Sequence, residues 1–275
     1  MTAASPFAVP LLSPTAVNTS LFGAKASNLA KAAQLGFSVP NGLAVPRTCT
    51  EGEFSLITQD ILDELSPPVA VRSSATEEDS AAKAFAGIFE TRLGIWSAND
   101  LVNAFAEVKS SGSAVRVKNY HGEVIQSEHI AVLVQRMVNA TRAGVAFSRD
   151  PNTGAPKVII ESNYGLGKSV VDGEVTPDSI ECLSDGTCNT FIGRKSTQIT
   201  LTDIGICVQD TPMADSQRSS LTNEEIRKIA SLTQKVEQAF GFAADIEWAF
   251  DADGVLWLLQ ARPITTITII EEKEN

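Results

Sequence analysis

The stretch that most constrains the fold is residues 244–265, where two runs of alternating apolar and polar residues flank Asp251-Ala252-Asp253-Gly254. A short connection ending in Gly between two such runs is typical of an antiparallel β-hairpin. With Phe250 facing Val255, we expect one face of this hairpin to lie in the core. That face carries Ile246, Trp248, Phe250, Val255, Trp257, Leu259 and Ala261.

The other face of the predicted hairpin carries Asp245, Glu247, Gln260 and Arg262. In the same register Glu247 lies opposite Leu258, so Glu247 and Gln260 become diagonal neighbours, about 7–8 Å apart at Cα. A hard cation bound through oxygens, with substrate phosphates as its other ligands, fits such a pair. The alternative is a solvated outer face, which is common for the polar side of an antiparallel sheet.

The overall composition is that of a globular protein. The chain has 275 residues, 43% of them hydrophobic, and a net charge of −11. This acidic balance argues against nucleic-acid and membrane partners. The four cysteines show no C-x-x-C spacing. The N-terminus lacks a basic segment followed by a long apolar run, and no stretch reaches the length of a membrane span. We therefore expect a soluble, cytoplasmic protein with reduced thiols and without a disulfide framework.

The order of predicted elements indicates an α+β protein with two lobes, divided as residues 1–125 and 126–275. Helices are expected over residues 23–35 and 53–65 of the first lobe. The second lobe is more antiparallel, and Thr222-Asn223-Glu224-Glu225 fits a capping box that opens an amphipathic helix ending at Gly241.

A first candidate site lies at residues 69–76, V-A-V-R-S-S-A-T, which predict a short strand that delivers Arg72 and the hydroxyls of Ser73, Ser74 and Thr76 into a loop. A guanidinium fork and hydroxyl groups suit phosphate oxygens. The alternative is a helix cap, because Ser74-x-x-Glu77 also fits a capping box. Lys25 follows Gly23-Ala24 and has two interpretations as well, a phosphate ligand or a solvated lysine.

A second candidate is Gln135-Arg136-Met137-Val138, at the end of the apolar strand expected over residues 129–135. Backbone groups there would read an adenine edge while Met137 packs on the ring, although a plain core Met is the alternative. The glycine loop at residues 164–168 matches neither common phosphate-binding glycine motif. The surroundings of His121 and His129 do not indicate nucleophilic catalysis.

Six motifs occur in an order that resembles one family. The chain is similar, from about residue 21 to residue 265, to the N-terminal nucleotide-binding domain of phosphoenolpyruvate synthase and pyruvate phosphate dikinase, which rifampin phosphotransferase shares and whose fold is of the ATP-grasp type. The motifs are V-A-V-R-S-S-A-T-E-E-D (69–79), F-A-G (85–87), G-V-A-F-S-R-D-P-N-T-G (144–154), E-S-N-Y-G-L-G-K (161–168), G-E-V-T-P-D (173–178) and D-I-E-W…L-Q-A-R-P-I-T.

This resemblance implies binding of ATP and Mg²⁺ by an ATP-dependent phosphotransferase, and it assigns roles to matching residues. Phosphate contact and catalysis would fall to Lys25, Arg72 and Arg262, and the phosphate loop would be lined by Ser73, Ser74 and Thr76. Adenine would be held by Gln135, Arg136, Met137 and Val138, and the nucleotide-binding set would also include Glu161. The metal would be bound by Glu247 and Gln260.

Two departures from the family pattern are Ile88, where F-A-G-Q is usual, and Lys168, where G-L-G-E is usual. In full-length relatives a mobile histidine domain accepts the phosphate. We therefore expect the acceptor here to be a histidine on a separate protein or a small molecule. The alternatives are a stand-alone ATP-dependent ligase or small-molecule kinase, and a non-catalytic nucleotide-sensing subunit.

Overall fold

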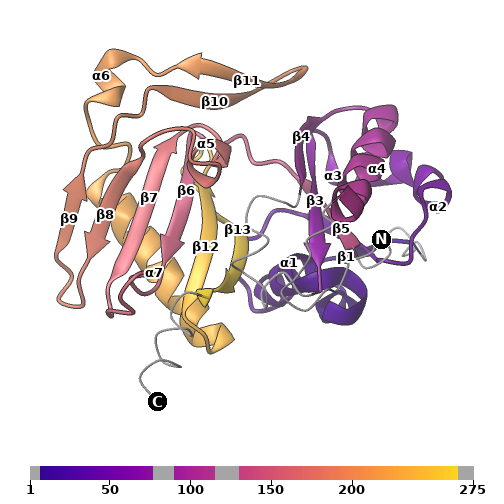
Figure 1. The fold of residues 1–275 in the computed structure, drawn as a ribbon, viewed down its shortest axis with the longest axis horizontal. Helices are drawn as coiled ribbons and strands as arrows, with labels where there is room; N and C mark the ends of the chain where they lie inside the picture. The colour runs from indigo at the N-terminus through magenta and orange to yellow at the C-terminus, as the bar shows by residue number, and fades with distance from the viewer. Residues whose placement is uncertain (1–6, 77–89, 115–129, 266–275) are drawn as a thin grey trace. The chain divides into compact units, whose positions relative to one another are not determined.

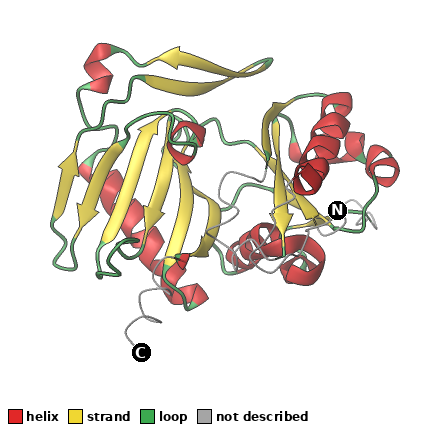
Figure 2. Ribbon diagram, in the orientation of Figure 1, coloured by secondary structure: helices red, strands yellow, loops and turns green. Residues whose placement is uncertain are grey.

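The computed structural model describes residues 7–76, 90–114 and 130–265, which fold into two compact units (Figure 1). The first unit comprises residues 1–137 with 203–205, and the second comprises residues 138–202 with 206–275. Helices and antiparallel sheets occur in both, which confirms the expected α+β class (Figure 2). His121, His129, Ile88 and the F-A-G motif lie outside the described residues.

The first unit contains a five-stranded antiparallel sheet in the order β1-β2-β5-β3-β4. Since β5 lies between β2 and β3, this unit extends to Met137, past the division at residues 125/126 expected from the sequence. The strands are β1 (Val9–Pro10), β2 (Gly42–Val45), β3 (Val69–Ala75), β4 (Thr91–Ile95) and β5 (Ile130–Arg136).

Alternation along β3 and β5 gives this sheet two different sides. Val69, Val71 and Val132 belong to an apolar core with the helices α2 (Glu51–Ser55), α3 (Thr58–Leu65) and α4 (Ala98–Ala114). The single helix expected over residues 53–65 is thus two helices, because a capping box at Thr50 starts α2 early and the chain leaves helical geometry at Ile57. Helix α1 (Thr19–Gln34) contacts the same two strands.

Helix α1 is interrupted at Gly23, which has φ 72° and ψ 172°. A Cβ at this position would lie 1.9 Å from the carbonyl oxygen of Ser74, so only glycine allows the close approach to β3. The regular helix restarts at Ala24, near the start expected from the sequence. The amide of Ala26 donates to Ser74 Oγ at 3.0 Å and ties the new first turn to β3.

The second unit is built on a six-stranded antiparallel sheet in the order β13-β12-β6-β7-β8-β9, with a separate pair β10-β11. Its strands are β6 (Arg142–Phe147), β7 (Val158–Tyr164), β8 (Asp178–Cys182), β9 (Cys188–Phe191), β10 (Thr197–Thr202), β11 (Gly205–Asp210), β12 (Ala244–Phe250) and β13 (Leu256–Pro263). The short helices α5 (Lys168–Val171) and α6 (Met213–Ser216) lie in its connections.

Helix α7 (Asn223–Phe240) packs on one face of the six-stranded sheet through Ile226, Ile229 and Val236, which are buried. The predicted capping box is confirmed, since Thr222 Oγ1 accepts from the Glu225 amide and the Glu225 carboxylate accepts from the Thr222 amide. Gly241 ends the helix in the left-handed conformation, as expected.

The C-terminal hairpin forms, but the expected register is wrong. Asp251 N donates to Val255 O at 3.2 Å, so the connection is three residues long, with Gly254 at φ 76°. Phe250 therefore pairs with Leu256 instead of Val255. A β-bulge between Glu247 and Trp248 then leaves Leu259 as an extra residue, and Glu247 pairs with Gln260.

This register changes the membership of the core face. Leu256 and Leu258 lie opposite Phe250 and Trp248, whereas Trp257 lies opposite Ala249 on the other face. The indole Nε1 of Trp257 donates to Asp251 Oδ2 at 2.8 Å. The expected placement of Val255, Trp257 and Leu259 in the core is thus wrong, because it assumed a four-residue connection and no bulge.

The expectation of reduced thiols without a disulfide is also contradicted. Cys182 of β8 and Cys188 of β9 are directly opposite each other and form a disulfide. Cysteines that are separated in sequence by a tight turn become neighbours in a hairpin, even without C-x-x-C spacing. Cys49 and Cys207 are free thiols, the first buried and the second exposed.

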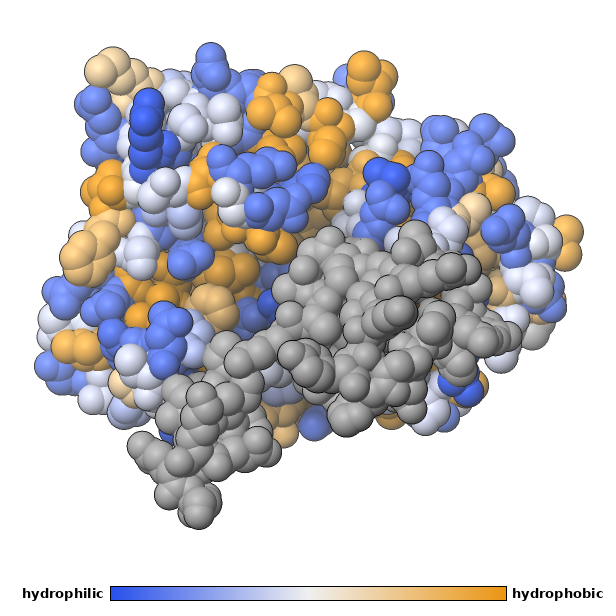
Figure 3. Space-filling view, in the orientation of Figure 1, coloured by the Kyte–Doolittle hydropathy of each residue, from blue (hydrophilic) through white to orange (hydrophobic). Residues whose placement is uncertain are grey.

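No described helix is long and apolar enough to cross a membrane. Hydrophobic and hydrophilic residues are interspersed over the face of the molecule in Figure 3. The mixed surface agrees with a mean hydropathy of +0.03.

Candidate functional site

A row of four residues crosses four strands of the second unit, and three of them are polar. Glu161 of β7 pairs with Val145 of β6, Val145 pairs with Glu247 of β12, and Glu247 pairs with Gln260 of β13. Residues directly opposite in neighbouring strands share a face, so Glu161, Glu247 and Gln260 lie in one row on the side away from α7. We call this side, with Asp245 and Arg262, the polar face.

The register brings the predicted metal-binding pair closer than the sequence suggested. Glu247 and Gln260 are direct partners rather than diagonal neighbours, which places their Cβ atoms about 5 Å apart. Gln260 is buried and Glu247 is half-buried. The three-residue connection and the bulge at Leu259 together cause this change, since each shifts the pairing of β13 by one residue.

Asp245, for which the sequence suggested no role, pairs with Arg262 across the same hairpin. Arg262 Nε donates to Asp245 Oδ2 at 2.8 Å. The carboxylate side chain is 11% exposed and the guanidinium side chain is 46% exposed. Asp245 thus fixes the base of an arginine whose outer end reaches solvent.

The polar face carries more negative than positive charge. Burial raises the pKa of Asp245, and the charge of Glu247 adds to this, while Arg262 opposes it. Burial together with the charge of Asp245 raises the pKa of Glu161. A cation bound among these carboxylates would relieve both effects, because an opposite charge favours the ionised form.

The donor set fits a magnesium ion that keeps substrate oxygens as ligands. Glu247 supplies a carboxylate and Gln260 an amide oxygen, and Mg²⁺ prefers oxygen donors with one or two carboxylates per site. Within the described part of the chain, no group of three or more His, Cys, Asp or Glu side chains could hold a metal by itself. Any metal here would therefore depend on ligands from a bound substrate or water.

In the first unit, Arg72, Ser73 and Ser74 lie inside β3 and not in a loop, which corrects the expectation. Strand β3 runs to Ala75 because it stays paired with β5 as far as Ile130. The period of two places Ser73 on the opposite side from Arg72 and Ser74, and both hydroxyl residues are fully buried. Ser74 lies within β3 and does not begin a helix there, and Glu77 of the alternative capping box lies outside the described residues. Thr76 follows the strand.

Lys25 and Arg72 lie near the contact between helix α1 and strand β3 in the first unit. Lys25 is the second residue of the restarted helix, next to Ala26, whose amide donates to Ser74. Arg72 is two residues before Ser74 on the same side of β3. The restarted helix runs to Gln34, so its N-terminal end adds positive potential beside the two cationic side chains.

The predicted adenine hinge is only partly available for a base. The amide of Arg136 donates to Asn41 O and the amide of Met137 donates to Pro68 O, both at 2.9 Å. The thioether of Met137 accepts from the amide of Gly94, and the Gln135 side chain donates to Pro40 O. The amides of Arg136 and Met137 thus serve the fold, and Val138 is the first residue of the second unit.

The glycine loop after Glu161 has a structural purpose. A Cβ on Gly165 would lie 2.1 Å from the carbonyl oxygen of Ile199, so the glycine allows β10 to approach β7. Leu166 N donates to the same oxygen at 2.7 Å. Lys168, which departs from the family pattern, forms an ion pair with Asp172.

Comparison with known proteins gives a family and several relatives. The family model of the pyruvate phosphate dikinase AMP/ATP-binding domain matches residues 51–275. The chain is 32% identical to the Bacillus subtilis protein named Uncharacterized phosphotransferase YvkC, covering 91% of this chain and 34% of that protein. It is 39% identical to the prodigiosin synthesizing transferase PigC of Serratia marcescens, with 72% and 23% covered. For the phosphoenolpyruvate synthase of Pyrococcus furiosus the identity is 34%, with 72% and 26% covered.

The chain therefore spans about a quarter to a third of the length of these curated relatives. Among solved structures, the D-alanine-D-alanine ligase from Coxiella burnetii aligns with a TM-score of 0.43 and 11% identity, over 90% of this chain and 48% of that one. An N5-carboxyaminoimidazole synthase from Aspergillus clavatus aligns with a TM-score of 0.44 and 10% identity, over 90% and 45%.

Proposed function

The chain belongs to the family of pyruvate phosphate dikinase AMP/ATP-binding domains, and on this premise we propose that it binds Mg-ATP and activates it for phosphoryl transfer. The observation that carries the proposal is the row of Glu161, Glu247 and Gln260 on the polar face, beside Arg262. This sheet surface carries a buried amide, several carboxylates and a guanidinium, which are more polar groups than packing alone requires.

The polar face is assigned to the metal and the phosphates. Glu247 and Gln260 would hold Mg²⁺, which supplies charge neutralisation on phosphate oxygens when bound. Arg262, held at its base by Asp245, would contact the transferred phosphate with its solvent-facing end. Glu161, in the same row, contributes a further carboxylate to the nucleotide-binding set.

In the first unit, Lys25 and Arg72 are assigned to the phosphates. Both lie beside the first turn of the restarted α1 helix, where backbone N–H groups favour anions. Ser74 keeps this turn in place through Ala26 and so acts on the fold rather than on the ligand. The backbone of the segment that contains Val138 is assigned to the adenine edge, with Met137 beside the ring.

We infer that the phosphoryl acceptor is a histidine outside this nucleotide-binding domain or a small molecule. The name of the Pyrococcus furiosus relative, phosphoenolpyruvate synthase, and that of YvkC, a phosphotransferase, agree with transfer chemistry. In transfer of this kind the protein mainly positions the phosphates and stabilises charge, and the residues above suit both tasks.

Isothermal titration calorimetry of the chain with ATP, in the presence and absence of Mg²⁺, tests the proposal. We expect saturable binding that requires the metal and is lost in Arg72→Met. Turnover is then followed by separating AMP from ADP, with and without candidate acceptor proteins. Absence of nucleotide binding in the presence of Mg²⁺ would sink the proposal.

A further inference from the structure

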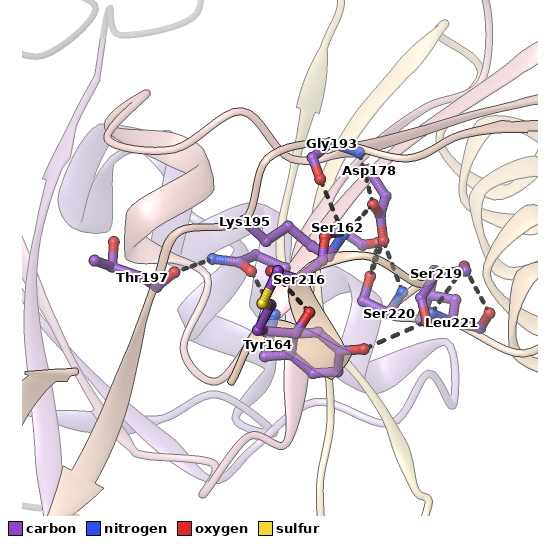
Figure 4. A network of polar contacts seen from close by, with 12 residues as sticks. Ser162, Tyr164, Asp178, Gly193, Lys195, Thr197, Ser216, Ser219, Ser220 and Leu221 are labelled. Atoms are coloured by element: carbon purple, nitrogen blue, oxygen red, sulfur yellow. Dashed lines mark hydrogen bonds and ion pairs between the residues drawn. The ribbon is translucent and has the colours of Figure 1, made fainter. Parts of the chain in front are cut away.

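A fully buried ion pair in the second unit joins three segments that are distant in sequence. Lys195 Nζ lies 2.5 Å from Asp178 Oδ1, and both side chains are 0% exposed (Figure 4). Nothing in the pattern around Lys195 predicted this, since a lysine in a polar stretch is usually solvated. The proposed nucleotide chemistry does not use this pair.

Every oxygen and proton of this pair is engaged. Asp178 Oδ1 also accepts from the amide of Gly193, and Oδ2 accepts from the amide and the hydroxyl of Ser220, each at 2.7 Å. Lys195 donates to the carbonyl oxygens of Gly193 and Ser216 as well, which uses its three protons. A buried charge pair satisfied in this way holds a single geometry.

One link between the network and β7 is a contact between two hydroxyls. Ser220 Oγ and Ser162 Oγ are 2.6 Å apart. Because Ser220 gives its single hydroxyl proton to Asp178, Ser162 is the donor in this bond. Ser162 immediately follows Glu161, so the residue next to a predicted site carboxylate is bonded to the network.

The segment that follows Lys195 is hydrogen-bonded to β7 and to the loop after it, just beyond Ser162. Asn163 Nδ2 donates to the carbonyl oxygen of Thr197 at 2.9 Å, and Leu166 N donates to that of Ile199 at 2.7 Å. Gly193 fits tightly at the other end, since a Cβ there would lie 2.0 Å from Pro177 O. The position of β10 beside β7 thus depends on where Lys195 is anchored.

We propose that Asp178 and Lys195 are positioning residues, which act through Ser162 and Asn163 to hold Glu161 at its place on the polar face. The proposal rests on the proposed function, because the effect is read as affinity for Mg-ATP. Glu161 lies in the same row as the proposed metal ligands, and for metal sites, altering the partners that orient a ligand changes affinity by about 10–100-fold. The same range is expected here for Lys195→Met.

Lys195→Met leaves a buried carboxylate without its cation, so two milder variants accompany it. Ser162→Ala removes only the hydroxyl link to β7, and the double variant Asp178→Asn, Lys195→Met removes both charges together. All are measured by calorimetry with Mg-ATP, by urea unfolding, and by hydrogen exchange of peptides that contain residues 161–168. Lys157→Met, which alters an ion pair at the other end of β7, is the matched control.

We expect folded Ser162→Ala to bind Mg-ATP more weakly, with faster exchange at residues 163–166, and Ser162→Thr to restore binding. Combining Ser162→Ala with Glu161→Gln should add no further loss, because both changes act on the same carboxylate. Losses that add fully, or folded variants that bind as the wild type and Lys157→Met do, would overturn the inference. A wild-type protein that binds no nucleotide would instead remove the proposed function.

Discussion

Arg262 donates from Nε to Oδ2 of Asp245 at 2.8 Å across the β12–β13 hairpin, so that a buried carboxylate holds a largely exposed guanidinium. The pair lies two residues along from Glu247 and Gln260, which are also direct partners. The Asp245–Arg262 ion pair and the proposed metal ligands Glu247 and Gln260 are therefore successive cross-strand pairs on one face of the hairpin.

Glu247→Gln should reduce Mg²⁺-dependent turnover on the order of 10²-fold, because it removes the charged donor of the proposed metal pair. The measurement is the initial rate over a Mg²⁺ titration at fixed ATP. Glu181→Gln, which alters an ion pair with Lys157 on the same sheet, is the control and should leave the rate unchanged. Identical Mg²⁺ curves for Glu247→Gln and the wild type would show that the metal pair is misassigned.

The metal-free protein should become less stable as the pH rises above the ordinary carboxyl pKa of about 4. Burial raises the pKa of Asp245 and of Glu161, so the folded state keeps protons that the unfolded chain releases. Their contribution is therefore fully present below the ordinary carboxyl pKa and is lost as the pH rises through the raised folded values. Urea midpoints across this range measure the slope, and we expect Asp245→Asn to flatten it.

The control for this pH profile is Asp215→Asn, which affects an ion pair with Arg218 that is more exposed. It should leave the slope as in the wild type. A steeper slope in Asp245→Asn would contradict the assignment of the profile to this carboxylate.

Gly23→Ala should destabilise the first unit by about 1–3 kcal/mol from backbone conformation alone, since φ 72° and ψ 172° are open essentially to glycine. The clash with Ser74 O adds to this cost. Gly52→Ala is the matched control, because Gly52 lies in α2 with open space around it and alanine favours the helix by up to about 1 kcal/mol. Urea unfolding of both variants checks the opposite signs.

Thiol alkylation, counted from the intact mass, should modify one cysteine in the native protein, two after denaturation and four after denaturation with reduction. In the native, non-reduced protein only exposed Cys207 should react, because burial and the nearby charge of Glu53 raise the pKa of Cys49 to about 11. Denaturation without reductant adds Cys49, and reduction adds Cys182 and Cys188. Four alkyl groups without reductant would exclude the disulfide.

Local patterns predicted the elements of this fold better than their register. The alternation around Asp251 and the capping box at Thr222 act over a few residues, and both predictions are confirmed. The bulge at Leu259 could not be read from the sequence. It depends on packing that buries Leu258 beside Trp248 and still returns Gln260 to the polar face.

Candidate residues were recognised by chemical type, whereas their local geometry followed from contacts that are distant in sequence. Polar residues after Val71 suggested the end of a strand, yet Ser74 is buried because Ala26, far away in sequence, supplies its hydrogen bond. Lys195 was missed for the same reason, since its partners Asp178 and Ser216 lie in other segments. The roles of the predicted site residues stay predictions for the experiments above.

The β-bulge at Leu259 decides which face of the terminal hairpin carries Gln260. If the strand had no bulge and Leu259 paired with Glu247, Gln260 would pair with Ile246 and turn toward α7. Deletion of this leucine should therefore keep Gln260 opposite Glu247, because Gln260 would then directly follow Leu258, the partner of Trp248. The path of the strand at Leu259, and not only the identity of residue 260, therefore decides whether the Gln260 amide joins the polar face.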